Sequence, residues 1–306
     1  MAAIRKVAIV GKGALGLLYG TLLSETLGQD AIYYLVDDAR YEAYASRPAP
    51  TVNGVPCTIS NVRASDAEPV DLIIVVVKSM GLEDALDEMK GAVGPNTRII
   101  SLMNGITSEE RIAERYGWTS TVLAIAQGMD AAYISGALTY SHTGEIRFGA
   151  APQTDPAAVR DIDEFLTECG ISHVVEDDMR HRLWIKFMLN VGINQTCMAY
   201  GGTFGTATDP KSEQFRCFIA AMRETMAVAH AEGVELTEDD LNSMAYIVTT
   251  LDPNSMPSMA QDRLNSKPTE VEEFSGTIIR LAEKHNILVP QNRWLYSRIR
   301  EIEASY

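Results

Sequence analysis

The first half of the chain alternates short apolar runs with segments of helical pattern. Five of these runs are rich in β-branched residues and are bounded by charged, polar or glycine residues: KVAIVG (6–11), AIYYLV (31–36), DLIIVVV (71–77), TRIISLM (97–103) and STVLAIA (120–126). Runs of this kind are typical of strands buried in a parallel sheet. The alternation of strands and helices therefore predicts a doubly wound α/β fold. LTYSH and EIRFG, around Thr143-Gly144, predict an additional hairpin.

The second half of the chain has a different pattern. After about Val175 the β-branched runs end, and long helical patterns follow at 179–200, 210–233, 237–250, 257–266 and 268–285. A chain of 306 residues also exceeds the usual size of a single hydrophobic core. We therefore expect two domains, an α/β domain over residues 1–178 and an all-helical domain over residues 179–306.

One helical segment combines an apolar composition with a regular set of polar residues. In WIKFMLNVGIN (184–194), Lys186, Asn190 and Asn194 recur every four residues, and nearly all of the other residues are apolar. Positions i, i+4 and i+8 follow one line along a helix. A helix that is apolar on its other faces belongs inside a protein, where an ammonium group and two amides need partners. The line either ties this helix to its neighbours or faces a polar cleft.

The charge and the cysteine content narrow the class of protein. The net charge of −15 argues against a nucleic-acid partner and against binding to an anionic membrane surface. The four cysteines are scattered, with no C-x-x-C pair and no histidine at ligand spacing, which indicates a reduced cytoplasmic protein without a metal site. The N-terminal residues lack the long apolar segment of a signal peptide. The longest apolar run, 72–77, is too short to span a bilayer.

The first predicted strand ends in a glycine-rich loop. Gly11-Lys12-Gly13-Ala14-Leu15-Gly16 has the pattern G-x-G-x-x-G, directly after a strand and at the start of a helix. Such glycines allow a tight turn and the close approach of a pyrophosphate, whose charge is attracted by the helix N-terminus. In this context the pattern predicts a dinucleotide site in the first domain. A glycine turn without a ligand is the alternative interpretation.

The end of the second predicted strand carries the residues that bear on the choice of cofactor. Asp37 and Asp38 follow Val36, about where an acid is expected after such a loop. A carboxylate at this point accepts hydrogen bonds from the ribose 2′-hydroxyl and repels a 2′-phosphate, which favours NAD over NADP. Two alternatives are open, because Arg40 lies close enough to bind a 2′-phosphate and because Asp37 can instead cap the following helix.

Several motifs follow one another along essentially the full length of the chain. They are GKGALG (11–16), VVVKS (75–79), MNG (103–105), W-x-K-x-x-x-N-x-x-x-N (184–194), SMAQD (258–262) and TE (269–270). With these motifs the chain resembles the ketopantoate reductase (2-dehydropantoate 2-reductase) family, and the last three are specific in this order and spacing. The resemblance implies a Rossmann-type domain followed by an all-helical domain, as in 6-phosphogluconate dehydrogenases, with nicotinamide and ketopantoate bound in a cleft between them.

The resemblance also implies a role for each matching residue. Lys186 matches the catalytic lysine, and Glu270 matches the glutamate that binds the substrate hydroxyl group. The residues that match those holding the substrate are Asn104, Asn190, Asn194 and Ser258. The expected cofactor contacts are the loop residues Gly11, Lys12, Gly13, Ala14, Leu15 and Gly16, together with Asp37, Arg40, Lys78 and Asn104.

Three positions depart from the family pattern. Asp37 stands where the family usually has an arginine for the 2′-phosphate, Gln195 replaces a common proline, and Phe204 stands where a further substrate-binding asparagine is expected. The first departure weakens the preference of the family for NADPH, so we expect NADP(H) to be slightly favoured and NAD(H) to be a close alternative. The last departure weakens the assignment of the exact substrate.

The expected chemistry fits these residue types. Reduction of a ketone places negative charge on the carbonyl oxygen, which needs a positive donor and then a proton, and Lys186 can supply both. A solvated surface lysine is the alternative for Lys186, and a plain Asn-Gly turn is the alternative for Asn104. For Glu270 the alternative is a cap in the first turn of a helix that begins at Pro268.

The sequence therefore predicts an NAD(P)-dependent oxidoreductase of pantothenate biosynthesis that acts on a small 2-oxoacid, ketopantoate or a close relative of it, in the cytoplasm. A dinucleotide-binding sensor without catalysis is one alternative. Another 2-oxoacid or 3-hydroxyacid dehydrogenase of the same architecture is a second one. The oligomeric state is open, and a homodimer is one of the alternatives.

Overall fold

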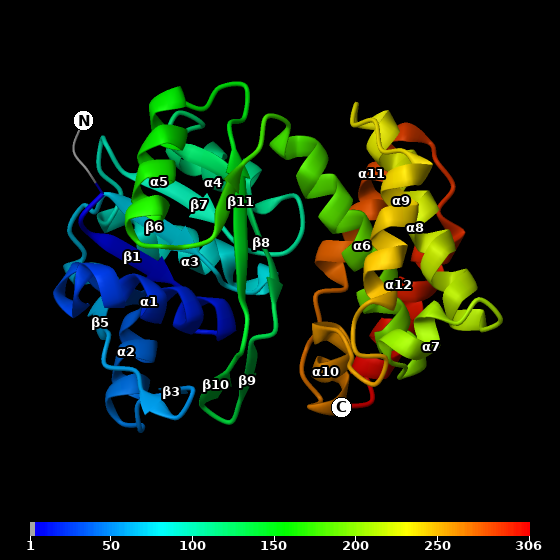
Figure 1. Ribbon diagram of the computed structural model, residues 1–306, viewed down its shortest axis with the longest axis horizontal. Coiled ribbons are helices and arrows are strands. Elements are labelled where there is room, and N and C mark those ends of the chain that lie inside the picture. Colours follow the sequence, from blue (N-terminus) through cyan, green and yellow to red (C-terminus); the bar gives the residue numbers. More distant parts are fainter. Residues whose placement is uncertain (1–3) are drawn as a thin grey trace. The chain divides into compact units, whose positions relative to one another are not determined.

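The structure, a computed structural model, describes residues 4–306 (Figure 1). The chain folds into two compact units, one that ends at Met179 and one that runs from Arg180 to Tyr306. The first unit combines strands and helices, and the second unit is helical. The expected fold class, a Rossmann-type α/β domain followed by an all-helical domain, is confirmed.

The first unit is built on an eight-stranded sheet in the order β12-β11-β8-β7-β6-β1-β2-β5. Its strands are β1 (Val7–Val10), β2 (Ile32–Val36), β5 (Ser60–Arg63), β6 (Leu72–Val75), β7 (Arg98–Ser101), β8 (Thr121–Met129), β11 (Thr143–Gly149) and β12 (His173–Val175). The strands from β8 to β5 are parallel, whereas β11 runs antiparallel to β8. All five apolar runs expected to be strands form strands of this sheet.

Both faces of the sheet are buried, as a doubly wound fold requires. Along β1 the side chains alternate, so that Val7 and Ile9 belong to one apolar cluster and Ala8 and Val10 to another. The first cluster includes residues of α1 (Ala14–Leu27) and α5 (Pro156–Glu168). The second cluster includes residues of α3 (Leu82–Glu88) and α4 (Ser108–Tyr116) (Figure 1). The remaining helix of this unit, α2 (Asp38–Ala45), follows β2.

The expected hairpin around Thr143-Gly144 is wrong. Gly144 lies within β11, which pairs with β8, and LTYSH contributes instead to a small second sheet of order β4-β3-β10-β9. The strands of this sheet are β3 (Thr51–Val52), β4 (Val55–Pro56), β9 (Ala132–Ile134) and β10 (Ala137–Thr139). The turn between β9 and β10 is Ser135-Gly136, with φ of 49° and 86°. Two positive φ angles suit a two-residue hairpin turn, and this turn decides the local pairing.

The second unit consists of helices. They are α6 (Met179–Tyr200), α7 (Phe204–Thr208), α8 (Glu213–Ala231), α9 (Glu238–Thr249), α10 (Ser258–Leu264), α11 (Thr277–His285) and α12 (Pro290–Glu303). A π-helical turn, η5 (Glu272–Gly276), leads directly into α11. The sequence did not predict α7 or α12, although Pro290 at the first position of α12 is a helix-start signal. Within residues 4–306, no helix has the length and apolar composition needed to cross a membrane.

Helix α6 forms the centre of the second unit. Phe187, Met188 and Val191 are at most 1% exposed, and the Phe187 ring lies 6.2 Å from the ring of Phe274 in η5. At Gly192, α6 approaches α8 so closely that an added Cβ would lie 2.6 Å from Met222 Cγ and 2.8 Å from Phe218 Cδ2. The two helices can pack at this distance only because residue 192 has no side chain.

Gly192→Ala is therefore expected to destabilise the protein, although alanine is the better helix former. The gain in helix propensity is about 1 kcal/mol, whereas overpacking a buried contact typically costs about 1–3 kcal/mol. The free energy of unfolding, measured by chemical denaturation, should fall, and the exposed Ser243→Ala in α9 serves as a control that should change it little. A more stable Gly192→Ala variant would show that α6 and α8 are not closely packed at this point.

Candidate functional site

The expected cofactor residues of the first unit follow four neighbouring parallel strands. In the sheet order β7-β6-β1-β2, Asn104 follows β7, Lys78 follows β6, the glycine loop follows β1 and Asp37 follows β2. The carboxyl ends of parallel strands meet at one edge of a sheet, so these residues lie along the same edge. The chain leaves β1 toward β2 on one side and returns to β6 on the other, which makes this point the topological switch where ligands bind in open α/β sheets.

The glycine loop is tightly packed at its two ends and open in its middle. Gly11 has a φ of 115°, and a Cβ on it would lie 2.7 Å from the backbone of Val76. A Cβ on Gly16 would lie 2.0 Å from the carbonyl oxygen of Gly11, whereas one on Gly13 would meet no atom within 4 Å. Gly13 is the N-cap of α1 and has no side chain to cap the helix. This open helix N-terminus fits a pyrophosphate, which needs backbone N–H donors and close approach.

Lys12 connects the loop to the neighbouring strands. Its Nζ donates to Asn61 Oδ1 at 2.8 Å, and lies 4.7 Å and 5.0 Å from the ring centroids of Tyr34 and Tyr44. Burial lowers the pKa of Lys12, while the two aromatic faces stabilise its charge. The ammonium group therefore holds the loop against β5 and the end of α2.

Asp37 caps the helix that follows it. It is the N-cap of α2, and its Oδ1 accepts from the Arg40 backbone N–H at 2.6 Å. The guanidinium group of Arg40 lies 2.8 Å from Glu88 Oε1 and 3.4 Å from Asp37 Oδ2. Burial raises the pKa of Glu88, although Arg40 opposes this. The capping alternative for Asp37 is thus realised, and the side chain of Arg40 is held by two carboxylates.

The other arginine at this end of the sheet is also paired with acids. Arg63, the last residue of β5, lies 3.1 Å from Asp38 and forms a second ion pair with Glu42. The group then comprises four carboxylates (Asp37, Asp38, Glu42 and Glu88) and two guanidinium groups (Arg40 and Arg63). The end of β2 therefore carries a surplus of negative charge.

Lys78 and Asn104 lie in turns at the same edge. Lys78 is exposed and is the N-cap of the short 3₁₀ turn Ser79–Gly81, in which the Gly81 N–H donates to its carbonyl oxygen at 2.8 Å. Asn104 is half-buried and precedes Gly105, which has a φ of 100°. The chain bends at these two residues, three positions after β7 ends at Ser101.

In the second unit, Lys186, Asn190 and Asn194 lie on one face of α6, as their spacing predicts. The helix has the bounds expected for it, residues 179–200. Lys186 and Asn190 are partly exposed, whereas Asn194 is only 6% exposed.

Ser258 is the exposed first residue of α10. Arg263 of the same helix donates to the carbonyl oxygens of Met198 and Ala199 at 2.6 Å and 3.2 Å. These bonds satisfy acceptors at the C-terminal end of α6, which a helix leaves without internal partners. The arginine therefore fixes α10, and with it Ser258, against the helix that carries Lys186.

Glu270 is a buried carboxylate, 9% exposed, directly before the π-helical turn. The helical turn begins at Glu272 rather than at Pro268, so the expected start of this helix is wrong. Its neighbour Thr269 donates to Glu303 Oε1 of α12 from both its N–H and its hydroxyl group, each at 2.7 Å. This pair of bonds fixes the chain on the N-terminal side of Glu270.

A buried polar network lies next to these residues, and the sequence did not predict it. Gln195 Oε1 accepts from the Ser275 N–H at 3.2 Å, and the Ser275 hydroxyl group donates to Asn292 Oδ1 at 3.0 Å. Asn292 Nδ2 donates in turn to Glu224 Oε2 at 2.9 Å. The one signal in the sequence was the departure at Gln195, where the family commonly has proline.

Phe204 begins α7 and does not lie in an open loop. Its N–H donates to the Ser255 carbonyl oxygen at 3.0 Å, and Thr203 forms a capping box with Thr206 at the start of the helix. The side chain is half-buried. The position where the family pattern has a further asparagine is therefore occupied by an apolar ring within an ordered helix start.

Two family models match the chain. The model described as ketopantoate reductase PanE/ApbA matches residues 7–153, and that of its C-terminal part matches residues 178–303. The chain belongs to the ketopantoate reductase family. It is therefore an oxidoreductase of a family that binds a nicotinamide dinucleotide.

Relatives match this family member over nearly its full length. The 2-dehydropantoate 2-reductase of Streptococcus pyogenes is 23% identical, over 97% of this chain and 98% of the relative. The enzyme of the same name from Pyrococcus horikoshii is 26% identical, over 98% of both chains. Sequence identities of 23% and 26% agree with the family assignment and do not identify the exact substrate.

Solved structures share the fold. D-mandelate dehydrogenase, in a ternary structure with NADH and anilino(oxo)acetate, has a TM-score of 0.86 at 24% identity and 98% coverage of both chains. A PanE/ApbA family ketopantoate reductase from Ralstonia eutropha has a TM-score of 0.82 at 24% identity, covering 98% of this chain and 99% of its own. A dimeric ketopantoate reductase from Staphylococcus aureus has a TM-score of 0.80 at 22% identity, with the same coverage.

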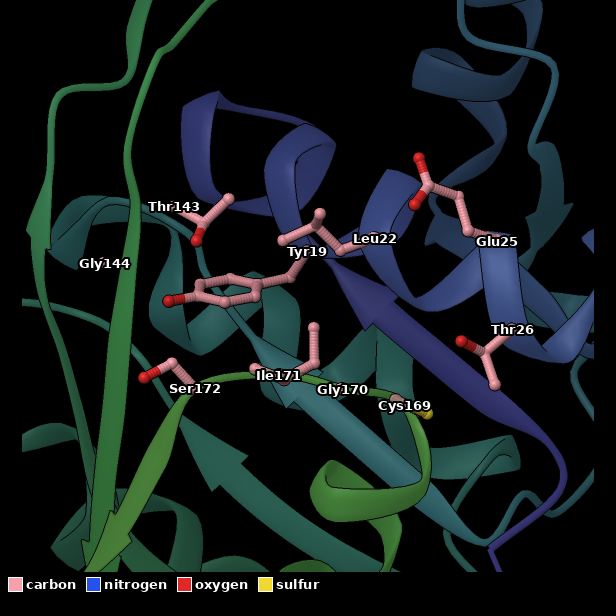
Figure 2. Close-up of a pocket in the computed structure, with 10 residues that line it drawn as sticks. All are labelled: Tyr19, Leu22, Glu25, Thr26, Thr143, Gly144, Cys169, Gly170, Ile171 and Ser172. Carbon is pink, nitrogen blue, oxygen red and sulfur yellow. The ribbon is translucent and has the colours of Figure 1, made fainter.

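A separate cavity of about 140 Å³ lies beside α1 in this ketopantoate reductase family member (Figure 2). Figure 2 shows the ring of Tyr19 extending toward Thr143 and Ser172. Tyr19 is 2% exposed, burial raises its pKa, and its hydroxyl group has no hydrogen-bond partner among residues 4–306. The cavity is polar and large enough for ordered water, which can supply that partner. None of the expected site residues lines it.

The cysteines are buried thiols. All four, Cys57, Cys169, Cys197 and Cys217, are free. Burial raises the pKa of Cys169 and of Cys217 to about 11 and that of Cys197 to about 12. Within residues 4–306, no group of three histidine, cysteine or acidic side chains is arranged to hold a metal ion.

The glycine loop gives two contrasting expectations for this family member. Gly13→Ala should weaken NADH binding by about tenfold or more, because the loop is the expected pyrophosphate site and the added methyl group would occupy its open middle, while the thermal unfolding temperature stays unchanged. Gly16→Ala should instead lower the free energy of unfolding by about 1–3 kcal/mol, because its Cβ would collide with the Gly11 carbonyl oxygen. Titration by fluorescence and thermal denaturation measure the two effects. Undiminished NADH binding by Gly13→Ala would place the pyrophosphate elsewhere.

Proposed function

We propose that this protein reduces ketopantoate, or a closely related 2-oxoacid, to the corresponding 2-hydroxyacid. The observation that carries the proposal is the line of Lys186, Asn190 and Asn194 on α6, one cation and two amides on a helix whose central residues are otherwise largely buried. Burying a polar group costs free energy unless the group has a hydrogen-bond partner, so a line of polar residues on a largely buried helix favours a binding or catalytic role. The matching Ser258 and Glu270, on α10 and before η5, support the same assignment.

Ketopantoate is the substrate that the relatives support, since the curated ones are named 2-dehydropantoate 2-reductases. The D-mandelate dehydrogenase structures share the fold and handle a different 2-oxoacid ligand, anilino(oxo)acetate. Phe204, at the place of an expected asparagine, makes the second unit more apolar there. The proposal therefore includes 2-oxoacids with a similar carboxylate and keto group and a different distal part.

The reaction adds a hydride and a proton across a carbonyl group. A dihydronicotinamide cofactor, whose pyrophosphate the loop from Gly11 to Gly16 would hold, would provide the hydride for C2 of the 2-oxoacid. Lys186 then acts on the carbonyl oxygen, where its ammonium group first stabilises the developing negative charge and then donates the proton that completes the hydroxyl group. A lysine suits both steps because it is a compact positive charge with three donors.

The remaining polar residues hold the substrate in this proposal. Asn104, Asn190 and Asn194 present amide donors and acceptors to the keto and carboxylate groups without adding charge. Ser258 offers a hydroxyl group at the start of α10. Glu270, as a carboxylate, accepts a hydrogen bond from the distal hydroxyl group of ketopantoate.

In the first unit, we assign the pyrophosphate to the loop from Gly11 to Gly16. Its backbone N–H groups and the N-terminus of α1 favour negative charge. Ala14 and Leu15 provide the first turn of that helix. Lys78, exposed at the end of β6, adds a positive charge at the same edge of the sheet.

The charges at the end of β2 support NAD(H) as the preferred cofactor, which reverses the order expected from the family resemblance. A 2′-phosphate carries about two negative charges, and each unfavourable pair at a few ångströms costs on the order of 1 to a few kcal/mol with surface-like screening. Arg40, the group that could offset this, is held by Glu88 and Asp37. The second Asp37 oxygen, not used for the backbone cap, can accept from a ribose 2′-hydroxyl.

A cytoplasmic location is part of the proposal, in keeping with four free, buried thiols. A homodimer is also retained as an expectation, because one structural relative is described as a dimeric ketopantoate reductase. Size-exclusion chromatography with light scattering measures the oligomeric state directly.

Lys186→Ala is expected to lower kcat by about a hundredfold or more, the scale for removing a positioned acid. The assay follows NADH and NADPH oxidation with ketopantoate and a panel of other 2-oxoacids, while NADH binding is titrated separately and should persist. Lys211→Ala, at an exposed lysine of the same unit, serves as the control and should behave as wild type. Near-normal turnover by Lys186→Ala would reject the assignment of the acid. Absence of turnover by the wild type with every 2-oxoacid would favour a dinucleotide-binding sensor.

Asp37→Ser tests the cofactor preference without removing the helix cap, because serine is also a good N-cap residue. We expect NADH to be preferred by the wild type, and the NADPH/NADH ratio of kcat/KM to rise by about tenfold or more in the variant, equivalent to about 1.4 kcal/mol. Asp155→Ser is a matched control, since Asp155 caps α5 near Thr119, before β8 begins and hence at the opposite edge of the sheet. An unchanged ratio in Asp37→Ser would shift the discrimination to Arg40 and Lys78.

A further inference from the structure

The π-helical turn after Glu270 leaves one backbone donor outside the helical pattern. The Phe274 N–H donates to the Glu270 carbonyl oxygen at 3.0 Å, four residues back, and the Gly276 N–H donates to that of Val271 at 3.0 Å, five residues back. The donor and acceptor are four residues apart in the first bond and five apart in the second. The N–H of Ser275, which lies between the two donors, therefore makes no bond within the helical pattern. Ser275 is fully buried, and a buried N–H needs an acceptor.

Gln195 supplies that acceptor from α6. Its Oε1 lies 3.2 Å from the Ser275 nitrogen, across 80 residues of sequence. Its Nε2 donates to the Val191 carbonyl oxygen at 2.8 Å, so the amide is held at both ends and its carbonyl group is directed at η5. The side chain is fully buried. A proline or an aliphatic residue at position 195 could not accept this bond.

The same turn is secured on its other sides. The Ser275 hydroxyl group donates to Asn292, which is bound by Glu224, and Thr269 is bound by Glu303. Glu270 therefore lies between two fixed points, Thr269 before it and the turn after it. Its own carbonyl oxygen accepts the first bond of the turn. If the turn changed from the π to the α register, it would contain one residue fewer. Because successive residues of a helix differ by about 100° in direction, the side chains beside the turn would then point in a different direction.

We propose that Gln195 is a positioning residue, which stabilises the π-helical turn and thereby directs the Glu270 carboxylate toward the distal hydroxyl group of the substrate. This rests on the proposed function, in which Glu270 accepts that hydroxyl group. Gln195 follows Asn194 directly, so one short stretch of α6 both carries a substrate-binding amide and sets the orientation of the carboxylate on another segment. The residue thus contributes to the choice between hydroxylated and unhydroxylated 2-oxoacids.

The test compares two substrates that differ only in the distal hydroxyl group, ketopantoate and 3,3-dimethyl-2-oxobutanoate. Gln195→Leu keeps the size of the side chain and removes the acceptor. We expect its KM for ketopantoate to rise by about tenfold, the scale of one hydrogen bond to a charged group, and its KM for the analogue to change by less than about twofold. Gln195→Glu, which as a buried neutral acid keeps both an acceptor and a donor, should restore the wild-type ratio.

Two further variants distinguish a loss of Glu270 positioning from a general loss of stability. Thr225→Val removes a buried hydrogen bond of α8, from Thr225 Oγ1 to the Ala221 carbonyl oxygen at 2.9 Å, and should leave the substrate ratio unchanged at a comparable loss of thermal stability. Glu270→Ala should show the same selectivity as Gln195→Leu, and the double variant should add little to it. A selective Glu270→Ala with an unselective Gln195→Leu would overturn this inference alone, whereas an unselective Glu270→Ala would overturn the role of Glu270 in the proposed function.

A second measurement does not depend on turnover. Amide hydrogen exchange of the Ser275 N–H, followed by NMR in the full-length protein, should be slow in the wild type and in Gln195→Glu and faster by tenfold or more in Gln195→Leu. Equal exchange rates in all three proteins would show that Gln195 does not hold the turn, and would overturn the inference whatever the substrate.

Discussion

A helix packed inside a folded unit needs partners for its buried polar groups, and much of α6 is subject to this constraint. Phe187, Met188 and Val191 are enclosed by neighbouring helices, and Gly192 lets α8 approach closely. Arg263 of α10 donates to carbonyl oxygens at the end of α6, and Gln195 accepts from the Ser275 N–H of the π-helical turn. The line from Lys186 to Asn194 is the part of α6 that we propose contacts the substrate.

In the first unit, the corresponding constraint is the charge around the glycine loop and the end of β2. Its glycine loop has a shape that only glycine permits at Gly11 and Gly16, and the open position at Gly13 faces the N-terminus of α1. One strand away, ion pairs fix Arg40 and Arg63 against more acids than they can neutralise. The open helix N-terminus thus lies beside a surface with surplus negative charge, and the proposed dinucleotide site includes both.

Local sequence patterns predicted most of this fold and failed where distant contacts decide. Five strands of the sheet and the bounds of α6 follow from runs and periodicities contained within each segment, whereas β5 and β12 were not predicted. The expected hairpin at Thr143-Gly144 was wrong because β8 is long enough to pair with β11, while Ser135-Gly136 makes the tighter turn. The helix expected from Pro268 begins later, at Glu272, in a π-helical turn whose Ser275 N–H donates to Gln195, far away in sequence. The residues expected in the site came from motif spacing and the resemblance, whereas the Gln195 network involves four separate segments that no local pattern connects.

The buried cysteines have a practical consequence for work on this protein. A thiol with a pKa of about 11 is a thiolate in only about one molecule in ten thousand at pH 7, and the thiolate is the form that reacts with alkylating agents. Because these thiols are buried, alkylating agents also cannot reach them in the folded protein. Labelling of these thiols in the native state therefore requires the chain to open, so its rate reports the opening of the segment around each cysteine. Cys169 belongs to the first unit and Cys197 and Cys217 belong to the second, so their labelling rates report the opening of each unit separately.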